Sequence, residues 1–305
     1  MPSRFACVWW SVGCCLCLTF VTVTAQRSQP LRSRTELVVL PVTAQDARGR
    51  LVRDLVESDF RILENGRAQP ITFFSDSHVP TAISLLIDTS ASMEANLAAT
   101  RVAASAIVGR LRSSDMGQVI TFSTTVDVRQ DFTSDHAQLQ RAIESTSASG
   151  ATALYNALYI GLRGLQKHRA PGSDVHREAI LLLSDGEDTA SLVEFDQVLD
   201  VARASQTLIY TIDLQIGTDP IRQRTSPGGF VLRRLAEQTG GRTYLVTDVR
   251  QLDRVYEEIY DAIAASYVLA YMPLPDGSPN KWRVISVTVD RPGVTARTRA
   301  GYFQP

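Results

Sequence analysis

Two runs of apolar residues constrain the fold of this chain more than any other feature. Residues 81–88 read TAISLLID, and residues 178–185 read EAILLLSD. Both have the length of a strand, and both are apolar at consecutive positions instead of alternate ones. A strand of this kind must be covered on its two faces, which requires helices on both sides of the sheet. The chain therefore cannot be a simple two-sheet β protein throughout.

The segments around these two runs alternate between helical and strand patterns. Helical spacing of apolar residues appears in 96–113, 153–168, 191–205, 230–240 and 249–266, and short apolar strands lie between them. Strand and helix in alternation are typical of a parallel sheet. We therefore expect an α/β fold with a doubly wound, mostly parallel, Rossmann-like sheet over residues 81–265.

Two further β segments flank this domain. Residues 36–78 contain an Asn65-Gly66 pair between alternating segments, a strong signal for a hairpin turn. Residues 266–305 contain the strand-like runs YVLAYMP and WRVISVTVD. Neither segment has enough strands to be stable alone, so we expect them to combine into one small β-sandwich. The α/β domain is then an insertion whose two ends lie close together.

The N-terminus indicates export. No charged residue occurs from Phe5 to Ala25, and the small residues VTA precede Gln26. This pattern predicts a signal peptide over 1–25, followed by a flexible lead-in over 26–35. The apolar run is also long enough to stay as a membrane anchor, the one way in which we expect contact with a membrane. All four cysteines lie inside it, which fits a periplasmic or secreted protein without disulfides.

The charge of the chain argues against nucleic-acid binding. The formal net charge is −1, and the arginines are scattered rather than gathered in a stripe with aromatic residues. We therefore expect no nucleic-acid partner.

Oxygen-bearing side chains gather where the predicted strands end. Asp88 ends the first apolar run and leads into Ser90 and Ser92, while Asp185 ends the second. Thr152 lies just before a predicted helix. Ligands of open α/β sheets bind beyond the carboxyl ends of the strands, so we expect these five side chains at one edge. Side chains at alternate positions of an extended loop point the same way, which lets 88, 90 and 92 face one ion.

Two carboxylates and three hydroxyls form a hard set of ligands that contains only oxygen. Such a set suits Mg²⁺, with Mn²⁺ as the alternative ion. So few negative ligands leave the ion electron-poor. We expect its open position to accept an Asp or Glu carboxylate from a partner protein that the sequence does not identify.

The D-x-S-x-S run at 88–92, the threonine of GATALYNA and the aspartate of LLLSDGED resemble the metal-ion-dependent adhesion site (MIDAS) of von Willebrand factor type A domains. The resemblance covers about residues 81–265, and the flanking segments resemble an exported bacterial subgroup of this family. It implies a protein-binding module rather than an enzyme. It also implies that Asp88, Ser90, Ser92, Thr152 and Asp185 hold the metal.

Simpler interpretations exist for each residue. Asp88, Ser90, Ser92 or Thr152 alone is a suitable helix cap, and Asp185 suits an ordinary turn. Glu187 and Asp188 are expected to be solvated loop acids. For the whole protein, the alternatives are a metal-free structural subunit of an envelope assembly and a hydrolase. A serine hydrolase needs G-x-S-x-G and a histidine partner, which we do not find.

Overall fold

The computed structural model describes residues 37–76, 79–168, 177–215, 226–264, 267–273 and 281–304. The predicted signal peptide and lead-in, residues 1–25 and 26–35, lie outside these ranges. Within them, no helix combines the length and the apolar character needed to cross a bilayer.

The central sheet has the order β10-β9-β8-β5-β6-β7. Neighbouring strands are parallel except for β6 and β7, which run antiparallel. The strands are β5 (Thr81–Asp88), β6 (Met116–Phe122), β7 (Val126–Thr133), β8 (Arg177–Ser184), β9 (Leu208–Leu214) and β10 (Thr243–Val246). The predicted doubly wound and mostly parallel sheet is therefore confirmed.

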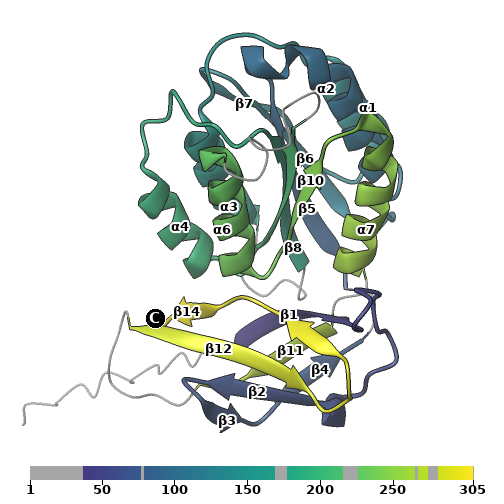
Figure 1. The fold of residues 1–305 in the computed structure, drawn as a ribbon, viewed down its shortest axis with the longest axis vertical. Coiled ribbons are helices and arrows are strands. Elements are labelled where there is room, and N and C mark those ends of the chain that lie inside the picture. Colours follow the sequence, from purple (N-terminus) through teal and green to yellow (C-terminus); the bar gives the residue numbers. More distant parts are fainter. Residues whose placement is uncertain are drawn as a thin grey trace, which may run out of the picture. The chain divides into compact units, whose positions relative to one another are not determined.

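Helices cover both faces of this sheet (Figure 1). Ile83, Leu85 and Ile87 of β5 pack with α1, α2 and α7, whereas Ala82 and Leu86 pack with α3, α4 and α6. The period of two along β5 thus divides its apolar residues between two cores, as its continuous apolar run requires. The helices are α1 (Leu97–Val108), α2 (His136–Glu144), α3 (Leu154–His168), α4 (Phe195–Ala204), α6 (Pro227–Thr239) and α7 (Leu252–Ala264).

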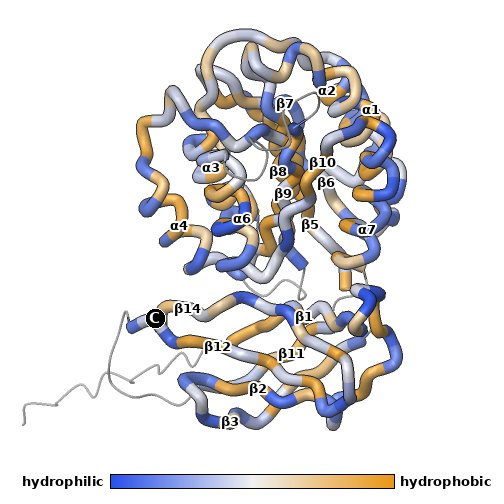
Figure 2. The backbone as a smooth tube through the Cα atoms, viewed as in Figure 1, coloured by the Kyte–Doolittle hydropathy of each residue, from blue (hydrophilic) through white to orange (hydrophobic). Residues whose placement is uncertain are grey.

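The flanking segments supply two antiparallel sheets. Their orders are β13-β1-β11-β4 and β14-β12-β2-β3, so each sheet mixes strands from before and after the α/β domain. The strands are β1 (Val38–Gln45), β2 (Phe60–Glu64), β3 (Arg67–Gln69), β4 (Phe73–Ser75), β11 (Tyr267–Tyr271), β12 (Trp282–Val289), β13 (Thr295–Arg297) and β14 (Gly301–Phe303). Figure 2 shows apolar residues along these strands as well as in the central sheet.

One apolar core joins the two sheets. Leu40 and Leu269 from one sheet and Ile62 and Val287 from the other belong to the same buried cluster. The predicted hairpin is present between β2 and β3, where Asn65 and Gly66 adopt the positive φ angles of a tight hairpin turn.

The ends of the α/β domain connect to adjacent strands of this sandwich. β4 precedes β5, β11 follows α7, and Ser75 is paired with Val268. The chain therefore leaves the sandwich and returns to it at neighbouring strands.

Candidate metal centre

Asp88 lies fully buried at the carboxyl end of β5. Its Oδ1 accepts a hydrogen bond from the Ser90 amide at 2.9 Å, and its Oδ2 accepts one from the Ser184 hydroxyl at 2.7 Å. Ser184 is the last residue of β8, the strand beside β5. Both partners are neutral. They hold the carboxylate in place but do not neutralise its negative charge.

Side chains in the loop after Asp88 point in two different directions. Thr89 turns toward β6, where its hydroxyl donates to the Phe122 carbonyl at 3.0 Å. Ser90 and Ser92 instead place their hydroxyl oxygens 3.1 Å apart. This division agrees with the alternation predicted from sequence. The chain then enters a short 3₁₀ helix, Ala91–Asn96, and the side chain of Ser90 makes no capping hydrogen bond to it. The alternative that Ser90 is there to cap a helix is therefore wrong.

Asp185 joins the same cluster from the loop after β8. Its Oδ2 accepts a hydrogen bond from the Ser92 hydroxyl at 2.9 Å, although the two residues are 93 positions apart in the chain. Asp88, Ser90, Ser92 and Asp185 thus form one continuous set of polar contacts.

Thr152 lies in a loop fastened on two sides. The Ala91 amide donates to the Gly150 carbonyl, and the Ser149 amide donates to the Thr89 carbonyl, which ties this loop to the serine run. On its other side, the Thr152 amide donates to the Thr189 hydroxyl at 3.0 Å in the loop after β8. The fold therefore brings the three predicted segments to one edge of the sheet.

The hydroxyl of Thr152 does not cap helix α3. Thr152 is 5% exposed, and no described residue makes a hydrogen bond with its hydroxyl. The amide of Tyr155 in the first turn of α3 is instead bound by the Asp188 carboxylate at 3.2 Å. The interpretation of Thr152 as a cap is wrong, and so is that of Asp188 as a solvated loop acid.

Close backbone packing positions the loop that carries Asp185. Gly186 has φ +84°, and a Cβ there would lie 2.6 Å from the Gly228 carbonyl group at the start of α6. A Cβ on Gly228 would likewise meet Gly186 at 2.6 Å. Only glycine at both positions allows this approach, which brings the first turn of α6 against the site.

Sequence reasoning missed one acid near this site. Asp213, at the carboxyl end of β9, is 1% exposed, and its Oδ1 accepts a hydrogen bond from Gln215 at 2.9 Å. Burial raises its pKa to about 6, and the charge of Asp185 acts in the same direction. The signal was an aspartate inside the apolar run TLIYTIDL, a position that needs a local reason.

The electrostatics of the cluster favour a cation. Burial raises the pKa of Asp88 to about 6, against the lowering effect of the hydrogen bonds from Ser90 and Ser184, while Asp185 raises it further. In the described ranges, neither Asp88 nor Asp185 forms an ion pair with a basic side chain. A buried carboxylate without a counter-charge is costly, so the residues present fit a hard divalent cation.

The donor set also limits which metal would suit it. In the described part of the chain, no three His, Cys, Asp or Glu side chains gather as in a zinc or iron centre. The cluster is rich in hydroxyls and poor in charge. This favours an ion that retains water ligands over one that needs soft donors.

Comparison with known proteins identifies the domain. Residues 83–187 match the family model of the von Willebrand factor type A domain. A structure of von Willebrand factor type A from Catenulispora acidiphila gives a TM-score of 0.52 at 12% identity, covering 89% of this chain and 75% of its own. No curated protein matches the chain.

A mussel protein has the same fold. Proximal thread matrix protein 1 from the mussel byssus gives a TM-score of 0.50 at 17% identity, covering 66% of this chain and 51% of its own. Another structure of that protein has zinc in its MIDAS motif, with a TM-score of 0.50 at 16% identity, covering 66% and 49%. At these identities the likeness concerns the fold alone. The family match shows a von Willebrand factor type A domain over residues 83–187 of this chain.

Proposed function

We propose that this domain binds Mg²⁺ through Asp88, Ser90, Ser92, Thr152 and Asp185, and that the bound ion accepts an Asp or Glu carboxylate from a partner protein. The observation that carries the proposal is the arrangement around Asp88. A fully buried carboxylate is surrounded by hydroxyls and a second carboxylate, with no basic side chain of the described residues beside it. Mg²⁺ supplies the missing positive charge, and Mn²⁺ has the same ligand preference.

Several observations support binding rather than catalysis. The hydroxyls of Ser90 and Ser92 contact each other and Asp185. Within the described ranges, neither hydroxyl has a histidine as a hydrogen-bond partner, so a nucleophile–base pair of the hydrolase type is not assembled. The site lies at the carboxyl edge of the sheet, where open α/β folds bind ligands. We therefore propose a non-enzymatic protein-binding module for adhesion or assembly.

We further propose that the protein acts outside the cytoplasm. The support comes from the sequence: an uncharged apolar N-terminus followed by small residues, and the lack of cysteine after Cys17. Fractionation of the producing cells, with N-terminal sequencing of the mature protein, distinguishes a cleaved signal from a retained anchor. Recovery of the uncleaved protein from the cytosol would contradict export.

Calorimetric titration tests the metal site directly. Purified wild type, Asp88→Asn and Glu187→Gln are titrated with MgCl₂ and then MnCl₂. Glu187→Gln is the matched control, because it removes an exposed acid from the same loop. We expect the wild type and the control to bind one ion and Asp88→Asn to bind none. A folded wild type that takes up neither ion supports the metal-free structural subunit instead.

A capture experiment tests the partner. Wild type and Asp88→Asn serve as baits for an envelope extract in Mg²⁺ and in EDTA. We expect a protein that is captured only by the wild type and only in Mg²⁺. Replacement of one of its exposed acids by the corresponding amide must then abolish capture. Capture that resists both EDTA and Asp88→Asn would show that the ion is not the point of contact.

A further inference from the structure

The edge strand β10 has free backbone groups. β10 pairs only with β9 among the described strands. The carbonyls of Arg242 and Val246 accept hydrogen bonds from the amides of Thr211 in β9 and of Gln215 just after it. Because backbone groups alternate in direction along a parallel strand, those of Thr243 and Leu245 point away from the sheet. Within the described ranges these outward groups have no hydrogen-bond partner.

Arginines line the cavity on one side of this strand. Tyr244 of β10 and residues of α7 border a cavity of about 450 Å³. Its lining contains two acids, Glu258 and Asp261, and the arginines Arg48, Arg50, Arg53, Arg242 and Arg254. This excess of positive charge contrasts with the net charge of −1 for the whole chain.

Two of these arginines have no ion pair with a described residue. Arg50, Arg53 and Arg254 form ion pairs with Asp46, Asp261 and Glu258. In the described part of the chain, Arg48 and Arg242 form none, and Arg242 lies instead over the ring of Tyr244, 5.0 Å from its centroid. Their charge is available to a ligand.

The opposite side of β10 carries charges of both signs. A smaller cavity of about 190 Å³ borders Thr243 and Leu245, and its lining also contains Arg233, Arg242, Arg297, Asp213 and Glu237. Leu245 is 45% exposed. Side chains of a strand alternate between its two faces, so a strand added to β10 would place one set toward the arginines and the other toward Leu245. In Figure 1, β10 lies between α6 and α7, which border these two sides.

We propose that β10 is a docking edge for an extended acidic segment of a partner protein, which pairs with Thr243 and Leu245 and directs alternate carboxylates toward Arg48 and Arg242. Strand addition of this type gains affinity from the backbone and specificity from the alternate side chains. The segment that fits best carries acidic residues at alternate positions, with uncharged residues between them on the side of Leu245. This inference does not depend on the metal site, which lies at the carboxyl edge of the sheet.

Charge argues against two other occupants. A second copy of the chain paired through β10 would add its own set of arginines to this edge of the sheet. Residues 26–35, which precede β1, carry three arginines and no acid. Like charges at close range disfavour both arrangements.

A labelled ten-residue peptide that alternates Glu and Val, with blocked termini, tests the charge requirement by fluorescence anisotropy. We expect saturable binding that weakens with salt, and no binding of the Lys–Val counterpart. Arg242→Glu should weaken binding about tenfold. Arg163→Glu, at an exposed position of α3, should leave it unchanged. Equal binding by Arg242→Glu, or binding of the Lys–Val peptide, overturns the proposal.

Amide hydrogen exchange tests strand pairing itself. Saturating Glu–Val peptide should slow exchange at Thr243 and Leu245, whose amides point away from the sheet and have no partner among the described residues, and should change Tyr244 little. Peptide binding without protection at 243 and 245 would show an anion site rather than a paired strand and would overturn the proposal. The same measurements in EDTA and on Asp88→Asn should be unchanged, so failure here is distinguishable from failure of the Mg²⁺ proposal.

Discussion

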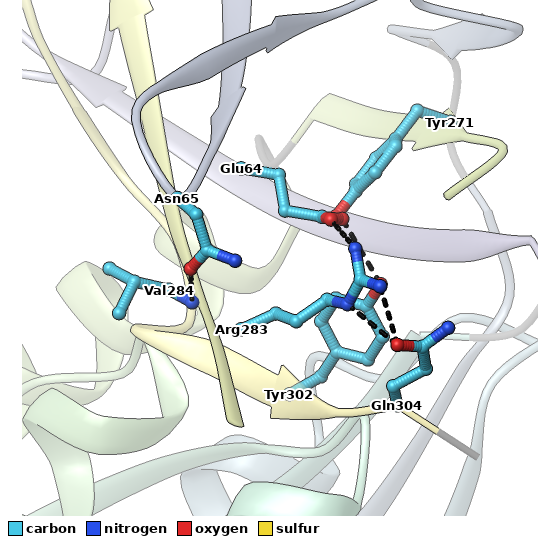
Figure 3. A network of polar contacts seen from close by, with 7 residues as sticks. All are labelled: Glu64, Asn65, Tyr271, Arg283, Val284, Tyr302 and Gln304. Carbon is cyan, nitrogen blue, oxygen red and sulfur yellow. Dashed lines mark hydrogen bonds and ion pairs between the residues drawn. The ribbon is translucent and has the colours of Figure 1, made fainter. Parts of the chain in front are cut away.

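Two buried carboxylates in this molecule are treated in opposite ways. Glu64, in the β-sandwich, is 4% exposed and forms an ion pair with Arg283, which is equally buried. The hydroxyls of Tyr271 and Tyr302 also donate to it (Figure 3). Asp88, in the α/β domain, is surrounded by an amide, hydroxyls and a second acid. Glu64 thus has a basic side chain as its counter-charge, whereas Asp88 has none among the described residues.

This difference separates a structural cluster from a candidate binding site. A buried ion pair whose remaining hydrogen bonds are satisfied is complete and offers nothing to a ligand. The Glu64 cluster is of this kind, because Arg283 also donates to Gln304. A buried acid with neutral donors is stable only if it is protonated or receives a cation from outside.

The largest effect is expected from Arg283→Met. It leaves Glu64 buried without a counter-charge, which should lower the free energy of unfolding by about 3–5 kcal/mol. Urea denaturation of the purified protein measures this. Arg61→Ala is the control, because its ion pair with Asp290 is exposed and should contribute less than about 1 kcal/mol. The double variant Glu64→Gln with Arg283→Met should recover part of the loss, and a double variant no better than Arg283→Met alone would argue against the charge explanation.

Removal of the Asp88 charge, in contrast, should not lower the free energy of unfolding. Without metal, Asp88→Asn removes an uncompensated buried charge and should leave stability unchanged or raised. Mg²⁺ at 100 times its dissociation constant should stabilise the wild type by about 2.7 kcal/mol and the variant not at all. Thermal denaturation with EDTA and with Mg²⁺ gives both numbers. A variant that Mg²⁺ still stabilises would place the ion elsewhere.

The pH dependence follows from the raised pKa values. An acid whose pKa rises from 3.8 to about 6 on folding binds more protons in the native state between these values. Its contribution to stability is fully present below the unfolded pKa and is lost as the pH rises through about 6. In EDTA we therefore expect the wild type to lose about 1–3 kcal/mol more than Asp88→Asn between pH 4 and 7.

Asp213 provides an internal comparison for this pH profile, because burial also raises its pKa to about 6. Asp213→Asn should reduce the same loss of stability in EDTA. Addition of Mg²⁺ to the wild type should reduce the part of the pH dependence of stability that comes from Asp88. If wild type and Asp88→Asn have the same profile in EDTA, Asp88 does not titrate in this range.

Much of the fold follows from residue patterns that act locally. The two-sided burial of β5 follows from its continuous apolar run, and the hairpin after β2 follows from Asn65-Gly66. The helical pattern expected over 230–240 ends at Gly240, and in the structure this glycine, in the left-handed conformation, ends α6. Short-range patterns are informative in these cases because the cause and the effect lie within a few residues.

Other features depend on partners that are distant in sequence. α2 was not predicted, because only Leu139, Ala142 and Ile143 of its residues are buried and its remaining surface is polar. Glu64 and Arg283 are 219 positions apart, and each lies in a strand of ordinary appearance. The meeting of Asp88, Ser90, Ser92 and Asp185 was predictable, because the carboxyl ends of neighbouring parallel strands lie at one edge of the sheet. Asp213 was missed because no motif accompanies it, although its place inside an apolar run was a signal.

The smallest effect on stability is expected from a substitution of Thr152. Comparison with Ser184 distinguishes a hydroxyl that binds the metal from one that supports the fold. No described residue hydrogen-bonds to the Thr152 hydroxyl, so Thr152→Val should change the free energy of unfolding by about 0.5 kcal/mol or less. Ser184→Ala is the matched comparison, because its hydroxyl donates to buried Asp88 and its loss should cost about 1–3 kcal/mol. For Mg²⁺ the expected order reverses: Thr152→Val should weaken binding about tenfold, a loss of about 1.4 kcal/mol, as expected for a ligand. Calorimetry and urea denaturation on the two variants decide the matter, since a Thr152→Val protein that binds Mg²⁺ normally would remove Thr152 from the metal centre.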